Sequence, residues 1–133
     1  MTNPYKLWKR YHISSLDDLR KMVQLFEQDQ PKSAGFDTET DGLHIIYSRP
    51  FLLQFGWLVP GKNYGRVFTM DTTRENVKTF FYLAKRVKYL LAHNIKFDLH
   101  MLTNIGYAEE VLSMTNLYDN MAVARLALEA VPA

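Results

Sequence analysis

Residues 35–43 have the sequence GFDTETDGL, in which acidic residues alternate with an aromatic residue and threonines. The alternation predicts a strand over residues 34–40, followed by an Asp-Gly turn. Side chains two residues apart on a strand point to the same face, so Asp37 and Glu39 share one face, roughly 7 Å apart. Thr38 between them faces the other way. The segment therefore predicts a strand that presents two carboxylates on one side.

Two carboxylates on one face are unfavourable to hold close together unless a cation lies between them. Mg²⁺ and Mn²⁺ suit such a pair, because hard cations prefer carboxylate oxygens. Acid pairs at this spacing are also common on ordinary solvated strand faces. The pair is therefore a weak signal on its own and needs support from elsewhere in the chain.

Residues 90–102 have the sequence LLAHNIKFDLHML, which predicts a short buried strand at 89–92 leading directly into a helix. Asn94 lies at the helix start, where its amide can cap the helix or position another group. Asp98 lies one turn further along, on the same side of the helix. Because ligands in such folds gather at strand ends, Asp98 is a candidate site residue. The alternatives are a plain cap for Asn94 and an ordinary acid near the helix dipole for Asp98.

The rest of the chain predicts an α/β or α+β layer fold with a mixed sheet, in the order helix, three strands, helix, strand, helix, helix. Strands at 51–59 and 66–71 flank the turn PGKNYG and should form a hairpin. Ser14 or Ser15 can cap the first helix, and Gly106 can stop the helix that carries Asp98. The first helix should bury an apolar stripe of Leu16, Leu19, Val23 and Phe26. A second helix, which starts at Thr72 or Thr73 and runs to about Arg86, should bury Val77, Phe80, Phe81 and Ala84. Asp119 should cap a last helix.

The composition is that of a globular domain. The chain has 133 residues, of which 47% are hydrophobic, carries a net charge of +2, and contains no cysteine. Disulfide and thiolate chemistry are therefore excluded. The mild positive charge permits a polyanionic partner without requiring one. No apolar segment has the length of a signal peptide core or a membrane span, so a cytoplasmic location without membrane association is expected.

Together, the DTETDGL and HNIKFDLHML segments resemble the first two motifs of the DnaQ-like, or DEDD, 3′–5′ exonuclease superfamily, which has a ribonuclease H-like fold. Residues 117–126 (LYDNMAVARL) are similar to the helix that follows the second motif in the proofreading domains of family A DNA polymerases and in ribonuclease D-like enzymes. The resemblance covers about residues 13–130. It implies a mixed β-sheet flanked by helices.

The resemblance assigns roles to individual residues. It implies that Asp37 and Glu39 are catalytic and bind one divalent metal ion, with Asp37 bridging to a second ion that Asp98 helps to hold. These ions would be Mg²⁺ or Mn²⁺. Leu43 would wedge against the terminal bases of the strand being cut, although a core leucine after the turn is an equal alternative. The substrate contacts implied are Asn94, Thr38, Leu43 and His93.

The third motif of the superfamily is missing from this sequence. That motif supplies a fourth carboxylate together with a Tyr or a His. Tyr-x-x-x-Asp does not occur, and His-x-x-x-x-Asp occurs only at residues 12–17 and 93–98, neither of them downstream of the second motif. We therefore expect residues 1–133 to be the N-terminal part of a single exonuclease domain in a longer protein. The chain alone should be weakly active or inactive.

The function expected from the resemblance is removal of nucleotides from DNA 3′ ends during replication, as in polymerase proofreading, by two-metal phosphodiester hydrolysis. The expected partners are a single-stranded DNA 3′ end and the rest of a polymerase or nuclease chain. Leu43, His44 and Tyr47 are candidates for stacking on bases. The alternatives are a ribonuclease D-like RNA 3′ exonuclease and a non-catalytic nucleic-acid-binding fragment of such an enzyme.

Overall fold

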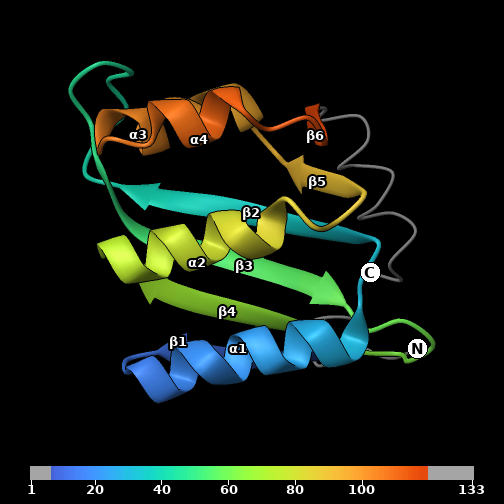
Figure 1. The fold of residues 1–133 in the computed structure, drawn as a ribbon. Coiled ribbons are helices and arrows are strands. Elements are labelled where there is room, and N and C mark those ends of the chain that lie inside the picture. The colour runs from blue at the N-terminus through green and yellow to red at the C-terminus, as the bar shows by residue number, and fades with distance from the viewer. Residues whose placement is uncertain (1–6, 120–133) are drawn as a thin grey trace.

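The computed structural model describes residues 7–119, which form one mixed six-stranded sheet with the strand order β1-β4-β3-β2-β5-β6 (Figure 1). In chain order the elements are β1 (Trp8–Ile13), α1 (Leu16–Asp29), β2 (Ser33–Thr40), β3 (Pro50–Leu58), β4 (Gly65–Asp71), α2 (Arg74–Ala84), β5 (Tyr89–Ala92), α3 (Ile95–Asn104), α4 (Ala108–Leu112) and β6 (Leu117–Asp119).

Strand β2 lies inside the sheet and carries the first motif. It pairs antiparallel with β3 and parallel with β5, and β5 in turn pairs parallel with β6. Because β2 and β5 are parallel, their carboxyl ends lie at the same edge of the sheet. The residues that follow β5, which include the second motif, therefore emerge at the edge where β2 ends.

Helices α1, α2 and α3 cover one face of the sheet (Figure 1). Aromatic rings build the core between the helices and the strands. The ring of Phe55 lies 6.3 Å from Phe26 of α1 and 5.3 Å from Phe80 of α2, and Phe80 also packs at 5.3 Å against Phe36 of β2. Such pairs contribute about 0.5–1.5 kcal/mol each beyond the area they bury. This packing fixes β2 with alternate side chains pointing into the core and away from it.

The fold class is confirmed, and so are the elements predicted between residues 14 and 106. The hairpin of β3 and β4 is present, with Gly56 opposite Val67, and the expected stripe of α2 is buried. The caps also form, since Ser15 accepts a hydrogen bond from the Asp18 amide at 3.1 Å. Gly106 has a φ of 103°, the left-handed conformation that ends a helix and favours glycine. Local patterns were sufficient for these elements because each has a clear period.

Strand β1 was not predicted. It is an edge strand that pairs in parallel with β4, and Trp8 packs so closely over Gly65 that a Cβ there would clash with the indole ring. Lys9 and Arg10 are exposed, so the strand lacks the clean alternation of a half-buried strand. Its partner strand lies more than 50 residues away, and a local pattern cannot reveal that pairing.

The end of the described chain differs partly from expectation. After Gly106 the chain forms the short helix α4 and the strand β6, neither of which was predicted, and Asp119 is the last residue of that strand. The helix expected to follow Asp119 lies outside the described residues.

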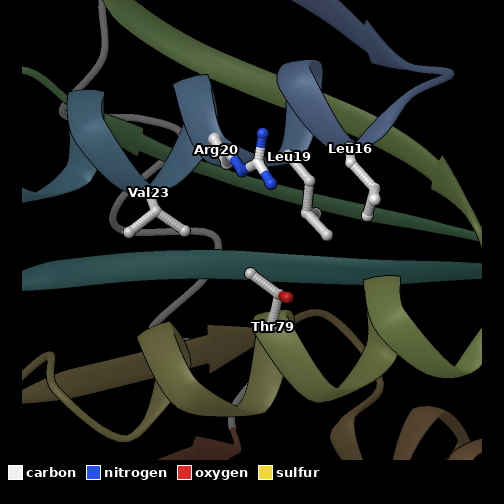
Figure 2. A pocket seen from close by; sticks show the side chains of 5 residues that line it. All are labelled: Leu16, Leu19, Arg20, Val23 and Thr79. Carbon is white, nitrogen blue, oxygen red and sulfur yellow. The ribbon is translucent and has the colours of Figure 1, made fainter.

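Leu16 is an exception on α1, since it was expected in the buried stripe but is 60% exposed. With Leu19, Arg20 and Val23 of the same helix and Thr79 of α2, it lines a shallow groove of about 230 Å³ (Figure 2). Leu16 stands at the first helical position, directly after the N-cap Ser15. Met22, which the stripe did not include, is fully buried instead.

Within residues 7–119, no helix combines the length and the apolar character that crossing a membrane requires.

Candidate active site

Asp37 and Glu39 lie near the carboxyl end of β2, and both are exposed on the face of the sheet opposite the helices. Thr38 is buried on the helix side. The pairing with β3 shifts register between Glu39 and Thr40, a bulge-like irregularity at the point where the two strands part. Irregularities of this kind re-aim side chains and are common beside active sites. Two carboxylates therefore project together from the end of this strand.

Asp98 lies in the first turn of α3 and is only 3% exposed. The Thr38 hydroxyl donates a hydrogen bond of 2.6 Å to its carboxylate. This contact joins the two sequence motifs across 60 residues of chain. A carboxylate held in the core is costly, and this hydrogen bond offsets part of that cost.

The electrostatics of Asp98 reflect its position. Burial raises the pKa of Asp98 to about 6. The hydrogen bond from Thr38 lowers the pKa, the nearby negative charge of Asp37 raises it, and His93 lowers it slightly. Asp37 therefore lies near enough to Asp98 to disfavour its ionisation. A cation near the two carboxylates would relieve this repulsion.

The three acids do not share one face of the sheet. Asp98 approaches β2 from the helix side through Thr38, whereas Asp37 and Glu39 point away from the helices. Among residues 7–119, no group of three or more His, Cys, Asp or Glu side chains is gathered closely enough to hold a metal ion. The donor chemistry nevertheless suits Mg²⁺ or Mn²⁺, because every candidate ligand is a carboxylate.

His93 and Asn94 follow β5 at the same edge of the sheet, and both are exposed. Asn94 occupies the N-cap position of α3, but within the described residues its side chain makes no capping hydrogen bond. The exposed amide is therefore not engaged in capping in this structure. His93 and Asp37 both line a groove of about 610 Å³ on the face away from the helices.

Leu43 is 89% exposed in the loop between β2 and β3, so it is not a core residue. Ile46 and Tyr47 in the same loop are 66% and 77% exposed. The rings of His44 and Tyr47 stack with their centroids 4.5 Å apart. The loop therefore presents apolar and aromatic side chains to solvent directly after the strand that carries Asp37.

Sequence reasoning placed the acids but missed the contact between Thr38 and Asp98. Thr38 was expected to contact substrate, and its buried hydroxyl instead bonds the second-motif acid. The signal available was the alternation itself, which put Thr38 on the face that the helices cover. The partner on that face could not be identified without the fold.

We predict that Asp98→Asn stabilises the metal-free protein at pH 7.5 by about 1–2 kcal/mol. A two-unit rise in pKa corresponds to about 3 kcal/mol, and the expected gain is smaller because the introduced amide is itself a buried polar group that needs hydrogen-bond partners. An acid whose pKa rises on folding, here from 3.8 to about 6, destabilises the folded state above pH 6. That penalty disappears as the pH falls from about 6 towards 3.8. The gain from Asp98→Asn should therefore be lost by about pH 4.

Urea unfolding in EDTA at pH 7.5 and at pH 4 measures this difference. Glu109→Gln on α4 is a matched control, because it neutralises an exposed carboxylate and should change stability little at either pH. A variant Asp98→Asn that is no more stable than the parent chain at pH 7.5 would contradict the burial cost described above.

Solved structures share this fold. RNase D from Trypanosoma brucei, in complex with RNA U12, matches with a TM-score of 0.61 and 16% identity over 87% of this chain. The Nibbler EXO domain from Aedes aegypti matches with a TM-score of 0.58 and 14% identity over 90% of the chain. Escherichia coli RNase D, an exoribonuclease involved in structured RNA processing, matches with a TM-score of 0.54 and 16% identity over 84% of the chain.

These likenesses confirm the predicted ribonuclease H-like fold class, since the chain has the fold of these exonuclease domains. The chain spans 38%, 56% and 27% of the three solved chains, respectively. No protein-family model matches the sequence, and a search of curated proteins found no match.

Proposed function

We propose that the chain is a metal-dependent 3′–5′ exonuclease domain that hydrolyses the terminal phosphodiester bond of a nucleic acid strand. The observation that carries this proposal is the hydrogen bond from Thr38 to Asp98 at 2.6 Å. It brings the two motifs of the sequence into contact at the end of β2, in a fold shared with exonuclease domains. Neither motif alone would be sufficient to indicate an exonuclease.

Asp37, Glu39 and Asp98 are the side chains that would hold the metal ions. Two divalent ions, when bound, supply an activated water and stabilise the leaving 3′ oxygen. Asp37 and Glu39 offer exposed oxygens on one face. Asp98 adds a carboxylate that lies near enough to Asp37 for the charge of Asp37 to raise its pKa. Mg²⁺ fits this all-oxygen donor set, and Mn²⁺ accepts the same ligands.

The remaining residues of the site would bind and orient the strand. The exposed amide of Asn94 and the ring of His93 lie at the end of β5, where they can donate hydrogen bonds to phosphate or sugar oxygens. Leu43 and the neighbouring exposed residues of its loop offer an apolar surface to the terminal bases. Base stacking on such side chains contributes about 1–3 kcal/mol per base.

The substrate is either DNA or RNA. Similarity of the motifs to polymerase proofreading domains favours a DNA 3′ end and a role in replication. The solved structures with this fold favour RNA, since one is an RNase D bound to RNA U12 and another is an exoribonuclease. Both substrates require the same carboxylates, so the choice between them affects contacts to the sugar and not the proposed chemistry.

We predict that 5′-labelled single strands of DNA and RNA with the same sequence are shortened from the 3′ end in Mg²⁺ or Mn²⁺ and stay intact in EDTA. The assay resolves the products on a gel. It should be run on this chain, for which we expect slow turnover. It should also be run on the longer protein that we propose to carry the third motif. The strand that is shortened at the higher rate identifies the preferred sugar.

A 3′-blocked oligonucleotide is the control, since an exonuclease of this polarity cannot start on it. No shortening of either strand by either protein would overturn the proposal. Binding without hydrolysis by both proteins would favour the non-catalytic nucleic-acid-binding alternative.

A further inference from the structure

The loop at residues 41–49, between β2 and β3, is closed at its base by hydrogen bonds between its first and last residues. The Asp41 amide donates to the Arg49 carbonyl at 3.1 Å, and the Arg49 amide donates to the Asp41 carboxylate at 2.7 Å. A compact surface loop whose ends meet in this way is often functional. The loop begins one residue after β2, two residues beyond Glu39.

A tight turn fills the inside of this loop. The buried Ser48 hydroxyl accepts a hydrogen bond from the His44 amide at 2.8 Å, and the Ser48 amide donates to the His44 carbonyl at 2.9 Å. The imidazole Nδ1 of His44 accepts bonds from the amides of Ile46 and Tyr47, each at 3.2 Å. Polar groups are therefore satisfied inside the loop, while the apolar side chains point outward.

Asn104, the last residue of α3, ties this loop to the helix. Its side-chain amide donates to the Ile45 carbonyl at 2.9 Å and to the Ser48 carbonyl at 2.8 Å. The Arg49 guanidinium donates in return to the Asn104 carbonyl at 3.1 Å. Three hydrogen bonds thus connect the loop to the helix that begins with the second motif and carries Asp98.

The exposed apolar side chains of the loop are largely uncovered by the described residues, and the Tyr47 ring packs only on one side, against His44. Leu43, Ile46 and Tyr47 leave most of their surface in water, which disfavours them unless something covers them. Their neighbour in sequence is the carboxylate-bearing end of β2. A surface that must contact a ligand needs to be held still, and backbone hydrogen bonds to a helix end can do this.

We propose that Asn104 is a positioning residue that fixes the loop at 41–49 relative to the carboxylates, so that the terminal nucleobase packs on Leu43 and Tyr47. This inference rests on the proposed function. Asn104 does not itself contact the nucleic acid. It sets the distance between the apolar surface and the acids by bonding to the loop on one side and ending the Asp98 helix on the other.

The test compares Asn104→Asp with Leu43→Ala in the full chain. Asn104→Asp keeps the shape of the side chain but removes both N–H donors. Hydrogen exchange should become about ten-fold faster at the Tyr47 and Ser48 amides in this variant, because their loop opens more often. Leu43→Ala should leave exchange unchanged, since it removes only an exposed side chain.

The second readout is the preference for a terminal base. Fluorescence anisotropy compares a single strand ending in a normal 3′ nucleotide with one ending in an abasic site, in Ca²⁺, with strand integrity checked on a gel. The parent chain should bind the normal strand about ten-fold more tightly, a ratio that fits stacking of one base. Both Asn104→Asp and Leu43→Ala should reduce the ratio to about one.

Thr103→Ala is the matched control, because Thr103 precedes Asn104 and its hydroxyl bonds, among residues 7–119, only to Leu99 of its own helix. It should keep both the exchange pattern and the ratio. If Asn104→Asp does not fold, Arg49→Ala removes one exposed tether and should still lower the ratio by about two-fold or more.

Unchanged exchange or an unchanged binding ratio in Asn104→Asp overturns the inference. A parent chain that binds or cuts 3′ ends without any preference for the terminal base also overturns it, while leaving the proposed exonuclease function intact. A parent chain that neither binds nor cuts 3′ ends overturns both.

Discussion

Asp37→Asn should lower metal-dependent shortening of 3′ ends by at least about a hundred-fold. Groups that merely orient a metal ligand already cost 10–100-fold when removed, and a ligand shared by two ions should cost more. The substitution keeps the shape of the side chain and its exposed position on β2. Only the negative charge is lost, so the folded structure should persist. Gel assays in Mg²⁺ and Mn²⁺ measure the rate, and calorimetric titration with Mn²⁺ measures binding.

Asp71→Asn is the matched control for this substitution. Asp71 is also an exposed carboxylate at the end of a strand, β4, but it lies outside both motifs. Its loss should leave the rate and the Mn²⁺ affinity within about two-fold of the parent. Full activity in Asp37→Asn would show that the first motif does not hold the metal ions.

The parts of the fold that local patterns predict are those with a strong period. The alternation in residues 35–43 placed Asp37 and Glu39 on one face of β2 and Thr38 on the other, as the burial of Thr38 confirms. The buried stripe of α2 follows from helical spacing in the same way. Periodicity states which side of an element is buried, because burial is what creates the period.

Periodicity does not state which partner lies on that side. The bond between Thr38 and Asp98 spans 60 residues, and the bonds from Asn104 to the loop span 56 and 59. Each partner is an ordinary polar residue in its own segment. Strand β1 was missed for the same reason, since its pairing with β4 is long-range and its exposed edge lacks alternation.

Resemblance to a family supplied the roles of the acids but not their orientation. The motifs suggested that Asp98 would converge with the first-motif acids, whereas its carboxylate is bonded to Thr38 on the helix side. Burial and the charge of Asp37 both act against ionised Asp98. The titration of Asp98 therefore depends on its surroundings, which a motif does not encode. Its assignment as a metal ligand remains a proposal that the Mn²⁺ titration can test.

The largest effect on stability should come from the ion pair between Asp29 and Arg66. The Asp29 carboxylate, 3% exposed, accepts bonds from the Arg66 Nε at 2.7 Å and from the Trp57 indole at 2.8 Å. Arg66 also donates to the Tyr11 hydroxyl at 2.8 Å. The Asp29 carboxylate raises the pKa of Arg66, so the guanidinium stays charged. The pair links the end of α1 to three strands of the sheet.

We predict that Asp29→Asn lowers the free energy of unfolding by about 3–5 kcal/mol, because it leaves a charged guanidinium in the core without its counter-ion. Urea unfolding at pH 7 measures the loss. Glu27→Gln is the matched control on the same helix, since Glu27 pairs with Arg86 at 3.4 Å with both side chains about half exposed. An exposed pair of this kind contributes about 0–1 kcal/mol.

The double variant Asp29→Asn with Arg66→Met separates the value of the pair from the cost of an orphaned charge. Replacing both members of a buried ion pair is often nearly neutral, so the double variant should be more stable than Asp29→Asn alone. This order follows because Arg66→Met removes the charge that Asp29→Asn leaves uncompensated, at the cost of the bond to Tyr11. A loss in Asp29→Asn no larger than that in Glu27→Gln would show that water reaches Arg66 and that the pair does not anchor α1 to the sheet.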